Sequence, residues 1–249
     1  MKSIYKRILI NREANHKMIA VLLDPDKCFG GVLSATISVL KSSVPDFIFV
    51  GGSHTLTSTE LFINLLKEET KATVIQFPGN AAQFTTKADA LLFLSLLSGR
   101  NAEFIIGQHI TSSVAIKKSA IEVIPTAYIL IDGGKPSSVE YMSNTHPIPN
   151  DKKDIALSTA VAGELLGMKL VYLEAGSGAE IPVPLDMIMH VSNGLHLPLI
   201  VGGGIKTIEQ LSTAFEAGAD LVVVGNIFET EISKIAEFVD FTHQLNSQE

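Results

Sequence analysis

LIVGGGIKT at residues 199–207 and LVVVGN at residues 221–226 are two apolar runs that each lead into glycine. An apolar run without polar alternation is typical of a strand buried on both faces of a parallel sheet. The segment between them, TIEQLSTAFEAGA at residues 207–219, has a helical pattern that Gly218 can end. A strand, a helix and a second strand in this order predict a parallel βαβ unit with a right-handed crossover.

The same apolar pattern occurs eight times along the chain, and helical patterns fill most of the intervals. The chain has 249 residues, which matches the roughly 250 residues typical of a (β/α)8 barrel. We therefore predict an α/β fold, a single (β/α)8 TIM-type barrel that forms one domain over residues 1–249. The expected strands are residues 18–24, 47–52, 73–79, 90–97, 126–132, 170–176, 197–204 and 221–226.

Two connections depart from the regular pattern. Only residues 80–89 separate the third and fourth runs, which barely suffices for the ~10–12 residues of a crossover with its helix. We expect the third helix to be missing or replaced by irregular chain, which would leave a groove on the flank of the barrel. The longest connection contains SNTHPIPNDKKD at residues 143–154, before an expected helix at residues 155–166. This loop is a candidate lid or subunit contact.

Charge and composition exclude several classes of function. Lys and Arg number 19 against 26 Asp and Glu, a formal net charge of −7, so no basic field attracts nucleic acid or an anionic bilayer. The longest apolar stretch, residues 90–97, is far shorter than the ~20 residues of a spanning helix, and the start of the chain has no secretory h-region. We expect a cytoplasmic protein without a nucleic acid partner or stable membrane insertion.

Cysteine and histidine give no sign of a metal centre. Cys28 is the single cysteine, and the histidines do not cluster at metal-ligand spacing. His54 is the only histidine expected near the mouth of the barrel. We therefore expect the histidines to be structural or exposed.

Glycines at the ends of the last two runs are candidates for phosphate binding. In many (β/α)8 barrels a phosphate lies between the loops after strands 7 and 8, because glycine lets backbone N–H groups approach the anion. Gly203, Gly204, Gly225 and Asn226 are therefore the predicted phosphate donors. The alternative is that these glycines only close tight turns. Lys206 either adds charge or is an ordinary solvated lysine.

A carboxylate stands in the otherwise apolar sixth run, in YLEAGSGA at residues 172–179. Burying Glu174 is costly unless it faces a polar barrel mouth. Glu174 is therefore a candidate general base whose pKa is raised by partial desolvation. The alternative is a carboxylate held in a structural ion pair. Gly176, Ser177 and Gly178 form a second loop of small residues that can hold a phosphate or a hydroxyl.

Carboxylates also follow the first run, in VLLDPDK at residues 21–27. Mg²⁺ favours one or two protein carboxylates together with water and substrate phosphates. Asp24 and Asp26 with Lys27 therefore suit an Mg²⁺ site, and FVGGS at residues 49–53 places the Ser53 hydroxyl at the end of the neighbouring strand. An Asp-Pro pair is also an ordinary turn former.

Taken together, these motifs resemble those of the geranylgeranylglyceryl phosphate synthase family, which includes the bacterial PcrB-like proteins. The resemblance spans essentially the whole chain, and YLEAGSGA is its most specific element. It implies a modified (β/α)8 barrel with its third helix replaced. It also implies an enzyme that joins the C3 hydroxyl of sn-glycerol 1-phosphate to a polyprenyl diphosphate and releases diphosphate.

The same resemblance assigns roles to individual residues. Asp24 and Ser53 match the Mg²⁺ ligands that hold the diphosphate, and Glu174 matches the group that takes the proton from the attacking hydroxyl. The matching glycerol phosphate site consists of Tyr172, Leu173, Glu174, Ala175, Gly176, Ser177, Gly178, Gly203, Gly204, Gly225 and Asn226.

One position departs from part of the family. The shorter bacterial members have a lysine immediately before the metal-binding aspartate, where this chain has Leu23. The departure places the chain in the archaeal-like branch and favours geranylgeranyl diphosphate over heptaprenyl diphosphate. Tyr128 either lines the prenyl groove or is an aromatic core residue. Family members form dimers and hexamers, so we expect a homo-oligomer, with Tyr141 as a candidate contact.

Two other functions fit parts of the pattern. A sugar-phosphate isomerase or aldolase would use the same phosphate loops, although Lys27, Lys135 and Lys206 all lie just past a strand end rather than inside one. A non-catalytic phosphate- or lipid-binding barrel would need no catalytic carboxylate. Replacing Glu174 discriminates between this last alternative and an enzyme.

Overall fold

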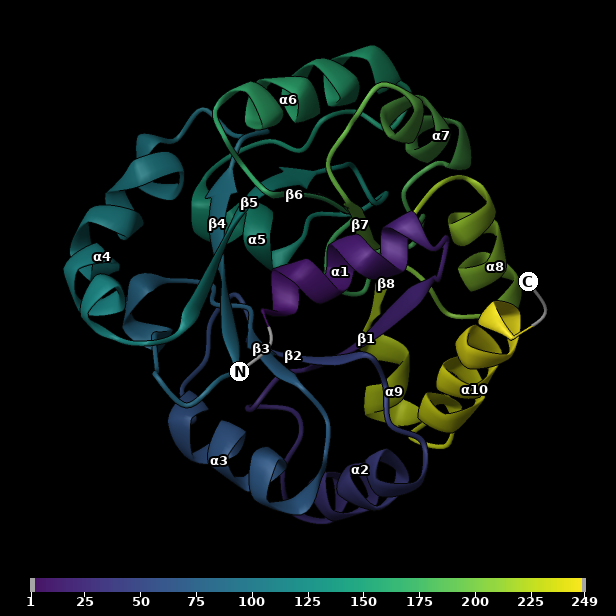
Figure 1. Cartoon of the computed structure of the whole chain (residues 1–249). Coiled ribbons are helices and arrows are strands. Elements are labelled where there is room, and N and C mark those ends of the chain that lie inside the picture. The colour runs from purple at the N-terminus through teal and green to yellow at the C-terminus, as the bar shows by residue number, and fades with distance from the viewer. Residues whose placement is uncertain (1–2, 248–249) are drawn as a thin grey trace.

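The computed structural model describes residues 3–247, in which eight parallel strands close into a barrel in sequence order. Helices surround this barrel (Figure 1). The predicted α/β barrel is therefore confirmed. The strands are β1 Met18–Leu23, β2 Phe47–Val50, β3 Val74–Gln76, β4 Ala90–Leu96, β5 Glu122–Leu130, β6 Leu170–Glu174, β7 Leu199–Gly202 and β8 Leu221–Val224.

Helices follow most of the strands, as predicted. Among the described residues, none of them is both long and apolar enough to cross a bilayer. The helices are α1 Ile4–Glu13, α2 Gly30–Ser42, α3 Thr59–Glu69, α4 Gln108–Lys118, α5 Ser138–Ser143, α6 Lys153–Leu165, α7 Leu185–Asn193, α8 Ile208–Glu216, α9 Asn226–Thr230 and α10 Lys234–Asn246, with a short 3₁₀ helix η1 Ala81–Gln83 and a π-helical turn η2 Glu103–Gly107.

The strands are apolar on both faces because each face meets a separate part of the core. In β2, Phe47 and Phe49 pack inside the barrel, whereas Ile48 and Val50 pack between the barrel and its helices. Successive side chains of a strand point to opposite faces. A strand buried on both sides therefore reads as a continuous apolar run, which is why the sequence indicates the strands but not which residues face the interior.

Helix α1, which the sequence patterns did not predict, covers the N-terminal end of the barrel (Figure 1). Its Ile4 and Ile8 side chains are buried against the residues of the barrel interior. The Glu122 carboxylate accepts hydrogen bonds from the backbone N–H groups of Ile4 at 2.6 Å and Tyr5 at 3.0 Å. The strand β5 begins at Glu122, four residues before the predicted start at residue 126, and its first residue takes part in this contact with α1. With the N-terminal end closed, the accessible mouth lies at the opposite end.

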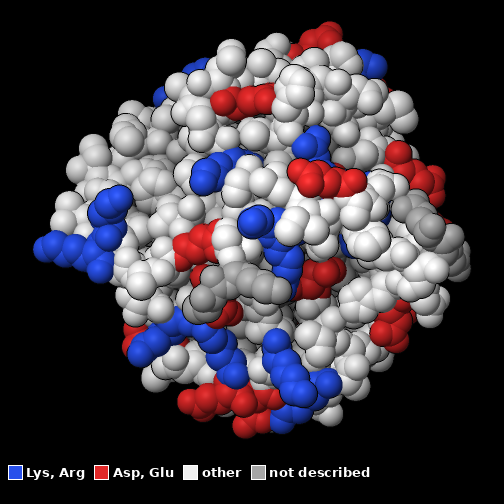
Figure 2. Space-filling model, viewed as in Figure 1, with Lys and Arg blue, Asp and Glu red and all other residues white. Residues whose placement is uncertain are grey.

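The surface on the side of α1 mixes charges of both signs. Figure 2 shows Lys and Arg side chains interspersed with Asp and Glu over this face. Ion pairs of the protein surface include Lys41 with Glu69 at 2.5 Å and Arg12 with Asp220 at 3.3 Å. This face offers no extended surface of a single sign among the described residues.

The connection between β3 and β4 has no α-helix, as predicted from its length. The three-residue η1 stands in its place, and amide side chains hold this stretch together. Buried Gln76 donates to the Gln83 carbonyl and accepts from the Thr85 N–H at 3.2 Å. Gln83 in turn donates to the Gly52 carbonyl at 3.0 Å, which ties this segment to the loop after β2.

The loop at residues 143–154 does not match the expectation of a lid. Its centre forms a parallel bridge between Ile148 and Ile131. The Ile148 N–H donates to the Leu130 carbonyl at 2.9 Å, and the Asp132 N–H donates to the Ile148 carbonyl at 2.9 Å. These two hydrogen bonds pair the backbone of the loop with the backbone at the end of β5. The loop is therefore fixed to the barrel.

Candidate active site

A polar pocket lies at the C-terminal ends of the strands. It brings together side chains and loops that are far apart in the sequence, among them the ends of β1, β2, β6, β7 and β8. Most of the predicted site residues therefore share one cavity. Those that line it are Asp24, Ser53, Tyr172, Glu174, Ser177, Gly178, Gly203, Gly204, Gly225 and Asn226.

Leu173 and Ala175 do not line the pocket. Their side chains pack in the core between the barrel and the helices. Adjacent residues of a strand face opposite sides, so the residues that flank inward-facing Glu174 must point outward. Gly176 also lies outside the lining, and its N–H donates to the Glu174 carboxylate at 2.7 Å.

Glu174 is buried at the end of β6 with an exposed fraction of 6%. Burial raises the pKa of Glu174, and the neighbouring Tyr172 side chain and the Gly176 N–H oppose the shift. No basic side chain of the described chain contributes to this balance. The alternative of a structural ion pair is therefore not what the structure shows. A carboxylate with a raised pKa and no cation is suited to accept a proton.

Glycines at the end of β7 and just after it leave space for the Tyr172 and Glu174 side chains of β6. A Cβ on Gly203 would collide with the Glu174 Oε1, and a Cβ on Gly202 would lie 2.5 Å from the Tyr172 hydroxyl. Any side chain at these positions would displace a site group. The Tyr172 hydroxyl is buried and has no partner in residues 3–247 that satisfies hydrogen-bond geometry. It is therefore available to a bound ligand.

Free backbone amides surround the same space. The N–H groups of Gly203, Gly204 and Gly225 donate no hydrogen bond to any described residue. Gly203 and Gly204 have φ values of +82° and +75°, which glycine adopts without the steric penalty of a Cβ. Successive amides in such turns form an anion-binding concavity. These three amides are suited to a phosphate.

Asn226 has a further role that the sequence did not indicate. Its Oδ1 accepts hydrogen bonds from the Gly178 N–H at 2.8 Å and from the Ser177 hydroxyl at 3.0 Å. The Asn226 side chain thereby fixes the loop after β6 against the end of β8. Its Nδ2 remains as the donor that can reach an anion.

Asp24 and Ser53, the predicted Mg²⁺ ligands, lie in the same pocket. Asp24 accepts the Asp26 N–H on Oδ1 at 3.0 Å, and its Oδ2 lies beside Gly52, where a Cβ would come within 2.9 Å. The described residues contain no group of three or more His, Cys, Asp or Glu side chains that could hold a metal. One carboxylate oxygen and one hydroxyl fit Mg²⁺ only where substrate phosphates complete its coordination.

Asp26, the second carboxylate of the predicted metal motif, does not line the pocket. Its oxygens accept the backbone N–H groups of Leu56 and Thr57, both at 2.7 Å. The Thr57 side chain and then the Leu56 amide lower the pKa of Asp26. Asp26 thus anchors the loop that carries Ser53 to the end of β1. The nearby Lys27 pairs with Glu229 at 3.0 Å.

If Asp24 and Ser53 bind Mg²⁺ as predicted, replacing Asp26 with alanine should weaken that binding without removing a metal ligand. The Ser53 loop would lose two hydrogen bonds, and groups that position metal ligands are typically worth about 10-fold to 100-fold in metal affinity. We expect the Mg²⁺ concentration for half-maximal activity to rise by about this factor. Asp26→Asn should have a smaller effect than Asp26→Ala, because the asparagine amide oxygen can still accept one of the two hydrogen bonds. Titration of activity with Mg²⁺ measures this. An unchanged Mg²⁺ dependence in Asp26→Ala would contradict the anchoring role.

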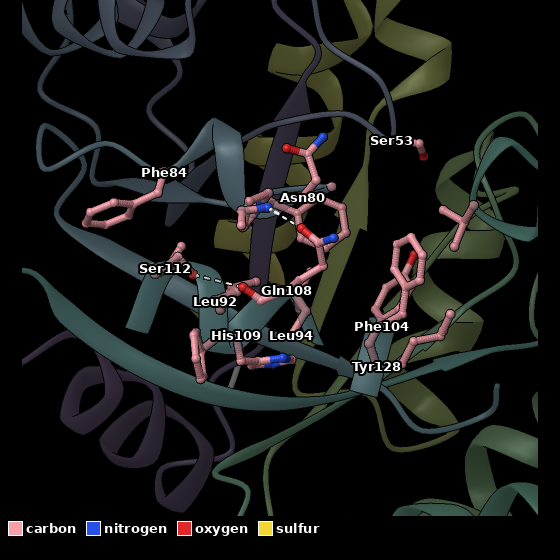
Figure 3. Close-up of a pocket in the computed structure, with 18 of the residues that line it drawn as sticks. Ser53, Asn80, Phe84, Leu92, Leu94, Phe104, Gln108, His109, Ser112 and Tyr128 are labelled. Atoms are coloured by element: carbon pink, nitrogen blue, oxygen red, sulfur yellow. Dashed lines mark hydrogen bonds between the residues drawn. The ribbon is translucent and has the colours of Figure 1, made fainter. Parts of the chain in front are cut away.

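An apolar groove opens from the polar pocket on the flank where η1 replaces a helix. It runs between η1, β4 and α4, and its walls include four leucines and four phenylalanines. In Figure 3, Phe84, Ser112 and His109 lie on one side of the view, and Ser53, Phe104 and Tyr128 on the other. Gln108 ties α4 to η1 by accepting the Ala81 N–H at 2.9 Å. The groove expected from the short third unit is present.

His109 is a groove residue that was not predicted, since only His54 was expected near the mouth. The His109 ring contacts Phe93 edge-on with 4.4 Å between centroids, and its Nε2 lies 3.1 Å from the Ser95 hydroxyl. Burial lowers the pKa of His109, which favours the neutral ring in an apolar wall. Its spacing in the sequence carried no metal or catalytic signal, so only the fold brings it to the groove.

The polar pocket and the groove meet at a junction of five residues. Both cavities are lined by Gly52, Ser53, Phe77, Tyr128 and Val139. Tyr128 is buried in the barrel interior and lines both cavities, so it is at once a core residue and a groove residue. No signal in the sequence indicated Phe77, which follows β3 in an ordinary Phe-Pro-Gly turn.

Comparison with known proteins agrees with this arrangement. Residues 11–242 match the model of the PcrB family. The chain is 46% identical over 241 residues to a geranylgeranylglyceryl phosphate synthase of Chitinophaga pinensis, with 96% of each chain covered. A protein of this name from Flavobacterium johnsoniae is 45% identical and covers 93% of the chain and 96% of its own length.

A solved structure of a geranylgeranylglyceryl phosphate synthase has the same fold as this chain. The (S)-3-O-geranylgeranylglyceryl phosphate synthase of Thermoplasma acidophilum, crystallised with its substrate sn-glycerol-1-phosphate, superposes with a TM-score of 0.89. The sequence identity is 32%, and the match covers 98% of this chain and 100% of that one. The chain therefore belongs to the PcrB family of geranylgeranylglyceryl phosphate synthases.

Proposed function

We propose that this enzyme joins the C3 hydroxyl of sn-glycerol 1-phosphate to geranylgeranyl diphosphate, with Mg²⁺, and releases diphosphate. The observation that carries the proposal is the junction at Ser53 between a polar pocket and an apolar groove. A phosphate ester and a long hydrocarbon chain require two such environments side by side. Neither an aldolase nor an isomerase of sugar phosphates has a use for the groove.

The phosphate of the small substrate is proposed to bind the free amides of Gly203, Gly204 and Gly225. The Tyr172 and Asn226 side chains line the same pocket and are proposed as further donors to this phosphate. Such contacts hold the glycerol with one hydroxyl towards Glu174, which lies in the same pocket at the end of β6. Holding two reactants in a fixed geometry removes much of the entropic cost of their encounter.

Glu174 is proposed to take the proton of the C3 hydroxyl as its oxygen bonds to the first carbon of the prenyl chain. The bond between that carbon and the diphosphate breaks, and its electron pair leaves with the diphosphate. Burial favours this role because it raises the pKa of Glu174 and thus its affinity for the proton. The apolar groove keeps water away from the reacting carbon.

Asp24 and Ser53 are the residues proposed to hold Mg²⁺. When bound there, the ion supplies charge stabilisation for the departing diphosphate. The residues support this role through the Asp24 Oδ2, which lies beside Gly52 in the pocket, and through the Ser53 position at the junction. Asp26 holds the Ser53 loop in place.

A product assay tests the proposal directly. Each enantiomer of radiolabelled glycerol 1-phosphate is incubated with prenyl diphosphates of increasing length, with and without Mg²⁺. We expect lipid-soluble label only with the sn-1 enantiomer and Mg²⁺, and most of it with the C20 donor. A preference for the heptaprenyl donor would support the same transfer with a longer chain. No lipid-soluble product in any combination would refute the proposal.

The enzyme is further proposed to form a homo-oligomer. Tyr141 on α5 is 84% exposed, so its ring is accessible to a subunit contact. Sedimentation of the wild type and of Tyr141→Ser measures this, and a monomeric wild type would contradict it.

A further inference from the structure

The first carbon of the prenyl donor must lie at the junction of the two cavities. This inference rests on the proposed function, in which the diphosphate lies beside Ser53 and the chain occupies the groove. Of the five residues at the junction, only Phe77 and Tyr128 are aromatic, and none is charged. The Ser53 hydroxyl is proposed to bind Mg²⁺, so the side chains left to face charge on the reacting carbon are two aromatic rings.

Backbone contacts fix Phe77 relative to Ser53. A Cβ on Gly51 would collide with the Phe77 carbonyl oxygen, and a Cβ on Gly79 would collide with the Gly52 carbonyl oxygen. The loops after β2 and β3 therefore touch backbone to backbone, which only glycine permits at these two points. The Phe77 N–H also donates to the Val50 carbonyl at 2.8 Å.

Neighbouring rings fix the orientation of the Phe77 side chain. It stacks on Tyr172 with 5.6 Å between ring centroids and an interplanar angle of 28°. Tyr128 contacts it edge-on at 5.9 Å, and Phe49 lies at 6.1 Å on the interior side. A ring packed in this way keeps its position while bonds at the junction change, so its electrons are preorganised for a charge that develops there.

We propose that Phe77 is a catalytic residue that stabilises positive charge on the first prenyl carbon in the transition state. As the bond from this carbon to the diphosphate oxygen lengthens, its electron pair moves to the diphosphate and the carbon becomes electron-poor. The ring attracts that charge through its quadrupole. The glycerol hydroxyl oxygen then completes its bond to the carbon, and its proton passes to Glu174.

Fluorination of the ring tests this role with little change in shape. Phenylalanine at position 77 is replaced by its mono-, di- and trifluoro analogues, because each fluorine withdraws electron density from the ring face. We expect the single-turnover rate to fall stepwise, by about tenfold in total at the trifluoro analogue. The affinities for both substrates should stay at their wild-type values, since the bound ground state carries no charge on that carbon. Phe77 suits this test better than Tyr128, which has a hydroxyl whose pKa fluorine would also change.

Phe215 provides the matched control. It is buried on α8 in the core between the barrel and the helices and lines neither cavity, so the same series at position 215 should leave the rate unchanged. A flat series at position 77 in an active enzyme would overturn the role of Phe77 and leave the proposed function intact. Equal losses at both positions would also overturn it, because they would reflect a general effect of fluorinated rings on packing. A wild-type enzyme that forms no product would overturn both proposals.

Discussion

Glu174→Gln should slow prenyl transfer by orders of magnitude and yet make the protein more resistant to heat. Loss of a positioned general base typically costs about 10²-fold to 10⁴-fold in rate, so we expect the turnover number to fall by this factor while sn-glycerol 1-phosphate still binds. Glutamine keeps the size of the side chain and an oxygen for the Gly176 N–H. Product formation, calorimetric binding of the glycerol phosphate and thermal melting measure the three effects. Unimpaired turnover would exclude Glu174 as the base.

The gain in stability follows from the sign of the pKa shift. Burial raises the pKa of Glu174 above its ordinary value of 4.5, so the fold favours the protonated carboxyl. This contribution is fully present below pH 4.5 and is lost as the pH rises through the raised pKa. At neutral pH the buried anion therefore destabilises the fold, and glutamine removes it. Glu180→Gln, at an exposed carboxylate nearby, should change neither stability nor activity.

The pH profile of the wild type should show the same shift. A base must be unprotonated to act, so kcat/KM should fall on the acidic side around a pKa above 4.5. The residual activity of Glu174→Gln should lack this limb. An acidic limb that persists unchanged in the variant would assign it to another group.

Asp24→Asn should lower kcat/KM for the prenyl donor by about three orders of magnitude, because a metal ion stabilises a departing charge by several kcal/mol. The binding of sn-glycerol 1-phosphate should persist, since its predicted partners lie on β6, β7 and β8. Steady-state kinetics over a range of Mg²⁺ concentrations measure the loss. Asp186→Asn is the matched control, because that carboxylate is largely exposed on α7 and lies outside the pocket.

High Mg²⁺ provides a second readout for Asp24→Asn. If Asp24 contributes to the affinity for the ion, additional Mg²⁺ should restore part of the activity of the variant. Wild-type kinetics in Asp24→Asn at every Mg²⁺ concentration would exclude Asp24 as a ligand.

Sequence reasoning predicted the strands and the pocket because both follow from simple chemistry. Continuous apolar runs have no stable place except between two layers, and Glu174 in such a run has no low-cost environment except a polar cavity. The short third connection likewise left no room for a helix. These inferences depend on the free-energy cost of burying a side chain and on the number of residues in a connection. Both can be judged from one sequence.

The features that the sequence did not predict depend on where side chains point and on which distant residues they contact. Asp24 and Asp26 are chemically equal in the motif, yet one faces the pocket and the other binds the amides of Leu56 and Thr57. Neither Phe77 nor His109 differs in the sequence from a core residue, and only the missing helix exposes them to a groove. Leu173 and Ala175 share the motif of Glu174 but point away from it. Each of these outcomes depends on the tertiary structure.

The cap on the barrel floor also orders the events of folding. Helix α1 leaves the ribosome early, but its Ile4 N–H finds its acceptor on Glu122, 118 residues later in the chain. Contacts at such a separation close late, because a long loop must first lose its freedom. Helix α1 therefore docks on the barrel only after the fifth strand has been made.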